Sequence, residues 1–206
     1  MSLCLLVWPA VARSQPPEPP GPFVVDVRGA FSSVGRSEEL AQPRGLQASE
    51  LPKTVLGLDL GAHVYPVRGR VTLGLGASLL MIGGTQAPGE AEAGTVNPAF
   101  STGEFRVRGI VPQLSLNFGS SRGWSYLGAG LGLSSLKAGR AESDVGYGPQ
   151  LLTINIGGGA RWFISEHAAF TFDGRYYRLG AKPLEGDYLG NPALAMFVIS
   201  AGVAFK

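Results

Sequence analysis

Apolar and polar residues alternate along eight segments of this chain, from residue 23 to its last residues. Alternation with a period of two places the apolar side chains on one face of an extended strand. No stretch keeps a helical apolar period, and Gly or Pro interrupts every stretch of helical length. An all-β fold is therefore expected. The predicted strands are Phe23–Ser33, Thr54–Pro66, Arg70–Ile82, Glu104–Phe118, Trp124–Leu136, Gln150–Ile164, Ala169–Leu179 and Leu194–Phe205.

Short and long connections alternate between these segments. The short connections are residues 67–69, 119–123 and 165–168. The long connections lie around residues 34–53, 83–103, 137–149 and 180–192. Transmembrane β-barrels have short periplasmic turns and long external loops, a difference that a soluble β-sandwich has no reason to show. The pattern predicts an eight-stranded antiparallel up-and-down transmembrane β-barrel, whose even strand number returns both termini to the periplasm.

The composition of the two faces indicates which one meets lipid. In the second segment Leu56, Leu58 and Leu60 share one face, and Asp59 and His63 share the other. The polar faces consist mainly of Gly, Ser and Thr, which would make a bare soluble surface but suits a narrow lumen. A few charged residues also lie on the polar faces, and we expect them to pair and fill the lumen, because an unpaired buried charge is costly. These residues are Asp26, Arg28, Asp59, Arg161, Asp173 and Arg175.

Aromatic residues gather in the apolar phase near the short connections. A periplasmic girdle of aromatic side chains is expected there, because such rings favour the membrane interface. The predicted girdle consists of Phe23, Phe118, Trp162, Phe170 and Phe205. In the fourth segment the apolar phase changes between Val107 and Ile110, and a β-bulge near Gly109 and Pro112 would reconcile the two halves.

The N-terminal region differs in composition from the rest. Leu3–Val11 is an apolar run too short to span a bilayer as a helix, and Ala10-Val11-Ala12 supplies small residues for cleavage. The sequence thus predicts a signal peptide at 1–14, although no Lys or Arg precedes its apolar run. A Pro-rich linker follows at 15–22, and the barrel takes up 23–206. The single cysteine, Cys4, falls in the leader, so no disulfide is expected in the exported protein.

Four segments resemble the small outer-membrane β-barrels of the OmpA/OmpX type. They are Tyr126–Gly132, Gly157–Ile164, Phe170–Tyr177 and the terminal run FVISAGVAF. The resemblance implies an outer-membrane location, contact with outer-membrane lipids, and recognition of a terminal aromatic residue by the barrel-assembly machinery. Here Phe205 is penultimate and Lys206 follows it, which departs from the usual terminal aromatic.

Several chemical functions lack support in the sequence. A formal net charge of +2, without clustered Lys or Arg, argues against nucleic acid as a partner. The glycine runs open no helix that could bind a phosphate. His63 and His167 have no second ligand at a metal-binding spacing, so neither a metal nor another cofactor is expected.

A structural or surface-interaction role through the long external loops is therefore predicted, with an external partner that the sequence does not name. One alternative is a membrane-embedded lipid hydrolase. Outer-membrane lipid A deacylases use a His-x-Ser-Asn motif near the end of a strand. At the equivalent place, this chain has Tyr176–Gly180, which contains neither His nor Ser. The other alternative is a narrow, porin-like pore or small-ligand carrier, which side chains filling an eight-stranded lumen would oppose.

Overall fold

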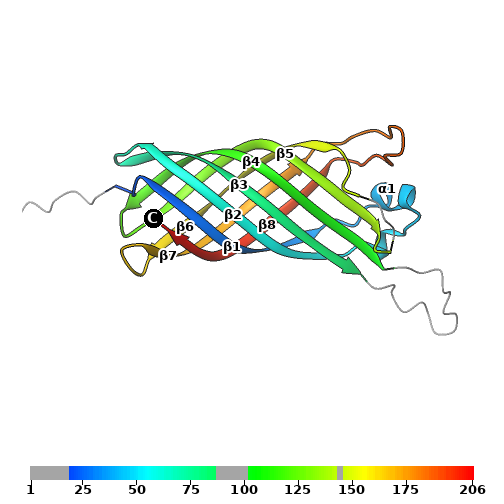
Figure 1. Ribbon diagram of the computed structural model, residues 1–206, viewed down its shortest axis with the longest axis horizontal. Coiled ribbons are helices and arrows are strands. Elements are labelled where there is room, and N and C mark those ends of the chain that lie inside the picture. Colours follow the sequence, from blue (N-terminus) through cyan, green and yellow to red (C-terminus); the bar gives the residue numbers. More distant parts are fainter. Residues whose placement is uncertain (1–18, 87–101, 143–145) are drawn as a thin grey trace, which may run out of the picture.

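The computed structural model describes residues 19–86, 102–142 and 146–206. The predicted signal peptide, the first part of the linker and most of the connection after the third strand lie outside these ranges. Figure 1 shows a barrel of tilted strands, with the short turns at one end and the long loops at the other. The strands are β1 (Phe23–Val34), β2 (Thr54–Val67), β3 (Val71–Gln86), β4 (Gly103–Ser120), β5 (Gly123–Arg140), β6 (Gln150–Phe163), β7 (Ala168–Leu179) and β8 (Leu194–Phe205).

The sheet is closed. Each strand pairs antiparallel with the next, and β1 pairs with β8 from Val25 opposite Phe205 to Val34 opposite Met196. Closure leaves no edge strand with unpaired backbone groups, which is the condition for a sheet to cross hydrocarbon. The predicted all-β, eight-stranded antiparallel barrel with sequential strand order is confirmed.

Alternate residues of each strand face outward, and these form a broad apolar belt. Leu58 is 46% exposed and Ile154 is 51% exposed, while their inward neighbours Asp59 and Asn155 are buried. Large apolar side chains so exposed would be unfavourable in water, but they suit a lipid environment. None of the helices in the described ranges is long and apolar enough to cross a membrane.

The predicted β-bulge in the fourth strand is wrong. Pro112 pairs with Ala77 in an unbroken β3–β4 register, and the β4–β5 register keeps the same offset on both sides of Pro112. The apolar phase changes because Phe105 and Val107 point inward and are buried among apolar residues. The side chains that line the lumen become apolar there, while the backbone pairing stays regular. The register shift instead lies in β2, between Val64 and Val67.

The interior has apolar packing at both ends. At the long-loop end, Leu40 and Ala41 of helix α1 (Glu38–Ala41) join the buried cluster that contains Phe105. Two short 3-10 helices, η1 (Gln42–Arg44) and η2 (Ala48–Glu50), complete this cap. At the short-turn end, Trp124 contacts Tyr65 edge-on and stacks on Phe163, with ring centroids 5.9 and 5.2 Å apart. Polar residues fill the barrel between these two clusters.

Candidate functional site

The six charged residues expected in the lumen all point inward and are at most 2% exposed. Asp26 of β1 accepts two hydrogen bonds from Arg161 of β6, from Nε at 2.8 Å and from Nη2 at 2.6 Å. This pair crosses the lumen, since β1 and β6 are not neighbours in the sheet. Both carboxylate oxygens are engaged, which gives the planar, two-point geometry that favours Arg–carboxylate pairs.

The other four charges form two pairs. Arg28 Nη2 lies 2.8 Å from Asp59 Oδ2, and these residues are direct partners in the β1–β2 register. Arg175 Nε donates to Asp173 Oδ1 at 2.8 Å within β7. Arg28 Nη1 also lies 3.7 Å from Asp26 Oδ2, so the cross-lumen pair and the β1–β2 pair are in contact.

Tyr126 links these pairs at the centre of the lumen. Its hydroxyl donates to Asp173 Oδ2 at 2.6 Å and accepts a long hydrogen bond from Arg28 Nη1 at 3.4 Å. The Arg161 guanidinium carbon lies 4.4 Å from the centroid of its ring. Tyr126 was not among the predicted site residues, although its position between the outward Ser125 and Leu127 gives it the inward phase. That alternation is the signal that could have identified it.

Serine hydroxyls complete the shell of Asp59. Ser78 Oγ donates to Asp59 Oδ1 at 2.6 Å, and Ser200 Oγ donates to Asp59 Oδ2 at 3.2 Å. With Arg28, three neighbours satisfy this buried carboxylate, as a charge removed from water requires. Both serines therefore serve as donors to a carboxylate, and neither is positioned as a nucleophile beside a base.

The two histidines lie in different surroundings. His63 is buried in the lumen with Nδ1 3.9 Å from Asp26 Oδ2. His167 lies in the exposed turn between β6 and β7. Within the described ranges, no group of three or more His, Cys, Asp or Glu residues is arranged to hold a metal ion.

The structure places the five predicted girdle aromatics on the outer surface at the short-turn end. Their exposed fractions range from 42% for Phe118 to 53% for Trp162. Trp162 and Phe170 stack across β6 and β7 with centroids 6.2 Å apart. Phe205 pairs with Val25 on one side and with Ala168 on the other, so it lies at the closing seam of the barrel.

At the opposite end, the connections between β1 and β2 and between β7 and β8 form an ordered layer, here called the crown (residues 35–53 and 180–193). Arg44 ties it together by donating to Leu40 O at 2.8 Å, Ala138 O at 3.1 Å and Gly190 O at 2.6 Å. One side chain thus joins its own loop, the end of β5 and the last loop. Partial burial lowers the pKa of Arg44 from its usual value, yet an Arg remains charged at any physiological pH.

A short hairpin forms the tip of the last loop. Lys182 and Asn191 exchange two backbone hydrogen bonds, at 2.8 and 3.0 Å. The Asn191 amide donates to Gly180 O and Pro192 O, and its Oδ1 accepts from the Tyr188 hydroxyl. Burial raises the pKa of that hydroxyl above its usual value. The hairpin is therefore held by side chains as well as by its backbone.

No family model matches the chain, and no curated protein matches it. Among solved structures it is similar to Neisserial surface protein A (NspA), at 15% identity and a TM-score of 0.57 over 90% of this chain and 97% of NspA. It is also similar to Ail of Yersinia pestis, solved with the heparin analogue sucrose octasulfate, at 14% identity and a TM-score of 0.49 over 89% of this chain and 97% of Ail. At such identities the likeness concerns the fold. The chain has the fold of the small, eight-stranded, OmpA-like outer-membrane β-barrels.

Proposed function

We propose that this protein is a non-enzymatic surface-interaction barrel of the outer membrane, with its crown outside the cell and both termini in the periplasm. The observation that carries the proposal is the three-way tie made by Arg44, which joins two loops and a strand end into one surface. A binding surface that is ordered before its partner arrives loses less entropy on binding. Loops that served only as connections would not need such a tie.

The placement of the chain ends supports this orientation. The first strand begins at Phe23 and the last ends at Phe205. The start of β1 and the end of β8 both lie at the short-turn end (Figure 1). Barrels of this class keep their short turns in the periplasm and their long loops outside. The crown would then face the exterior, where a macromolecular partner can reach it.

The lipid hydrolase alternative receives less support. At the place where a deacylase motif is expected, Tyr176 faces outward and Tyr177 is buried in the lumen. Among the described residues, no serine hydroxyl is hydrogen-bonded to a histidine ring, the arrangement that activates a serine nucleophile. These observations favour a role without covalent chemistry.

Cysteine labelling on intact cells tests the orientation. With Cys4 replaced by Ser, one variant carries Asp187→Cys in the crown and its matched control carries Glu166→Cys in a short turn; both positions are exposed acidic residues. A membrane-impermeant maleimide should label Asp187→Cys on intact cells and Glu166→Cys only after permeabilisation. The reverse pattern would overturn the proposed orientation.

Binding through the crown needs a second measurement. The folded barrel in lipid nanodiscs is passed over arrays of immobilised matrix proteins and polysaccharides, beside a variant in which residues 182–191 are replaced by a short Gly-Ser turn. We expect retention on at least one surface and its loss in the variant. Retention that survives the replacement, or no retention on any surface, would contradict a crown-mediated interaction.

A further inference from the structure

The outer face of β4 carries two arginines near the long-loop end. Arg106 and Arg108 alternate with the buried Phe105 and Val107, so both point away from the lumen. Lys137 of β5 lies directly opposite Arg106 in the strand register. Cations on the lipid-facing surface are costly at the bilayer midplane and tolerated near the interface. These three therefore mark the level at which the barrel meets lipid headgroups.

Glu104 holds two of the three cations in place. Its carboxylate lies on the same face, with Oε1 2.5 Å from Arg106 Nε and Oε2 3.0 Å from Lys137 Nζ. The Glu104 side chain is only 4% exposed, whereas that of Arg106 is 54% exposed. Three cations against one carboxylate leave the cluster at +2 (3 − 1). Glu104 thus orders the cluster without neutralising it.

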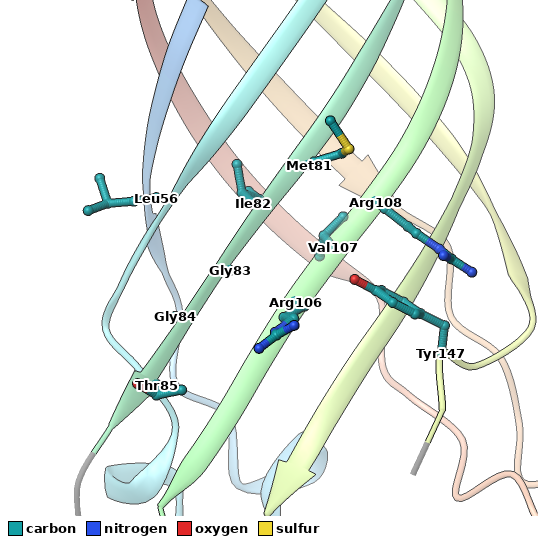
Figure 2. Close-up of a pocket in the computed structure, with 10 residues that line it drawn as sticks. All are labelled: Leu56, Met81, Ile82, Gly83, Gly84, Thr85, Arg106, Val107, Arg108 and Tyr147. Atoms are coloured by element: carbon teal, nitrogen blue, oxygen red, sulfur yellow. The ribbon is translucent and has the colours of Figure 1, made fainter. Parts of the chain in front are cut away.

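A groove of about 520 Å³ runs along the outer face, and Arg106 and Arg108 line it. Figure 2 shows Arg106, Arg108 and Tyr147 on one side of it, with Leu56 and Met81 on the other. The two apolar residues belong to the outward phase of β2 and β3, and they continue into the apolar belt. The groove therefore joins a cationic wall to an apolar one.

Gly83 of β3 keeps the groove open. It lies between Leu56 and Arg106 in the register. A Cβ at this position would come within 2.8 Å of Arg106 Cγ, closer than such atoms pack. The missing side chain leaves room beside the aliphatic part of the Arg106 side chain. Any larger residue would clash with it.

Tyr147 restrains the second arginine. The Arg108 guanidinium carbon lies 3.9 Å from the centroid of the Tyr147 ring, which comes from the connection between β5 and β6. A cation held over an aromatic face is already ordered, so it loses less conformational freedom when an anion binds. Arg106 and Arg108 are thus both positioned before any ligand arrives.

We propose that this groove binds a phosphorylated lipid of the surrounding leaflet, with its phosphate at Arg106 and Arg108, its acyl chain along Leu56 and Met81, and Lys137 adding positive charge beside Arg106. The planar, multi-donor guanidinium group matches the geometry of phosphate oxygens. A neutral lipid would leave the charge of the cluster unmatched, and a free phosphate would make no use of the apolar wall. That the leaflet is the outer one rests on the orientation proposed above.

The test measures lipid binding to the purified, folded barrel by native mass spectrometry, with diphosphorylated lipid A and its dephosphorylated form as probes. Arg106→Gln with Arg108→Gln should weaken binding of the phosphorylated probe about 25-fold, since each cation near an anionic lipid accounts for about fivefold. Arg178→Gln is the matched control: it removes an exposed outward cation at the same end, on β7 between Ile154 and Ala195. It should change binding less than about twofold.

Gly83→Val tests the shape of the groove with every charge retained, and it should also weaken binding. Heat-modifiable electrophoretic mobility verifies that each variant is folded. Equal binding of both lipid forms, or an equal loss in Arg178→Gln, would overturn the proposal. Displacement of the lipid by millimolar inorganic phosphate would also overturn it, because the site would then recognise a free anion.

The lipid site and the proposed orientation can be tested independently of each other. Native mass spectrometry on purified barrel does not depend on which end faces outward, whereas the cysteine labelling does. Selective binding of the phosphorylated lipid together with reversed labelling would overturn the orientation alone. Correct labelling without lipid selectivity would overturn the lipid site alone.

Discussion

Asp59 has three hydrogen-bond donors around a carboxylate that water does not reach. Arg28, Ser78 and Ser200 all donate to it. Asp59→Ala would leave the Arg28 guanidinium without its closest partner in the lumen. Removing one member of a buried pair costs about 3–5 kcal/mol, so we expect a loss of that size in the free energy of unfolding. Urea titration in lipid vesicles measures it.

Asp187→Ala is the matched control for Asp59→Ala, because it removes the same side chain from an exposed position in the crown. Its effect on unfolding should be close to zero. Equal stability of the two variants would show that the Arg28–Asp59 pair does not hold the barrel together.

The sequence indicates which charges share the lumen, but not which of them meet. Arg28 and Asp59 are register partners, whereas Asp26 reaches Arg161 across the barrel. Cross-lumen pairing depends on the stagger of strands that do not touch, and no local pattern encodes that stagger. Tyr126 was missed for a related reason: it lies in a glycine-rich run, and its importance comes from three strands converging on it.

Tyr188 offers a pH-dependent contact outside the membrane. Its hydroxyl donates to Asn191, and burial raises its pKa above the ordinary value. A raised pKa means that this contact contributes fully below the unfolded-state pKa of about 10 and is lost as pH rises through the higher folded-state pKa. A pH titration of tyrosinate absorbance in the wild-type protein and in Tyr188→Phe isolates the signal of Tyr188 as the difference between the two curves. That difference should appear at higher pH than the ionisation of an exposed tyrosine. A difference curve centred at the ordinary value would contradict this.

At the scale of whole strands, the outward face governs insertion. Leu58 of β2 and Ile154 of β6 are half exposed and lie in the apolar belt. Leu58→Arg should cost about 2–4 kcal/mol, measured by reversible folding into vesicles. Leu73→Arg and Ile154→Arg should cost less, because Leu73 lies close to the level of Phe118 and Ile154 lies opposite Arg178, nearer the two interfaces. Leu184→Arg, which places the same change in the exposed crown, should cost far less. Similar costs at all four positions would argue against the assigned lipid-facing surface.

The end of β8 is a second determinant of assembly. Phe205 lies at the seam, and Lys206 Nζ donates to Ser121 O at 2.7 Å while lying 4.0 Å from the Phe163 ring centroid. Deleting Phe205 and Lys206 should lower the amount of folded, heat-modifiable barrel in membranes. Lys206→Ala alone should lower it less, because the strand pairing of Phe205 remains. Undiminished assembly of the truncated chain would show that the terminal aromatic is dispensable.

Alternation predicted the strand ends well at the short turns and less well at the long loops. β3 extends to Gln86 rather than Ile82, and β5 extends to Arg140 rather than Leu136. Beyond the hydrocarbon the outward positions become polar, as at Thr85 and Lys137, so the contrast between faces disappears while the backbone pairing continues. The helices α1, η1 and η2 are too short to show a helical period and were not predicted.

For the whole molecule, the decisive question is whether the closed lumen can conduct ions. Three Arg–Asp pairs and Tyr126 fill its middle, the aromatic cluster around Trp124 closes one end, and the apolar packing beneath α1 closes the other. An eight-stranded lumen is about as wide as the side chains that fill it. The wild-type barrel in planar bilayers should therefore show no steady conductance.

The double variant Asp26→Ala with Arg161→Ala removes both members of the cross-lumen pair, so no charge is stranded and the vacated space can admit water. It should show brief openings that the wild-type protein lacks. The control, Leu58→Ala, shortens a side chain on the outer face and should remain silent. A steady wild-type conductance of porin size would overturn the plugged interior and favour the pore alternative. A silent double variant would show that the remaining pairs and the two end clusters suffice to close the barrel.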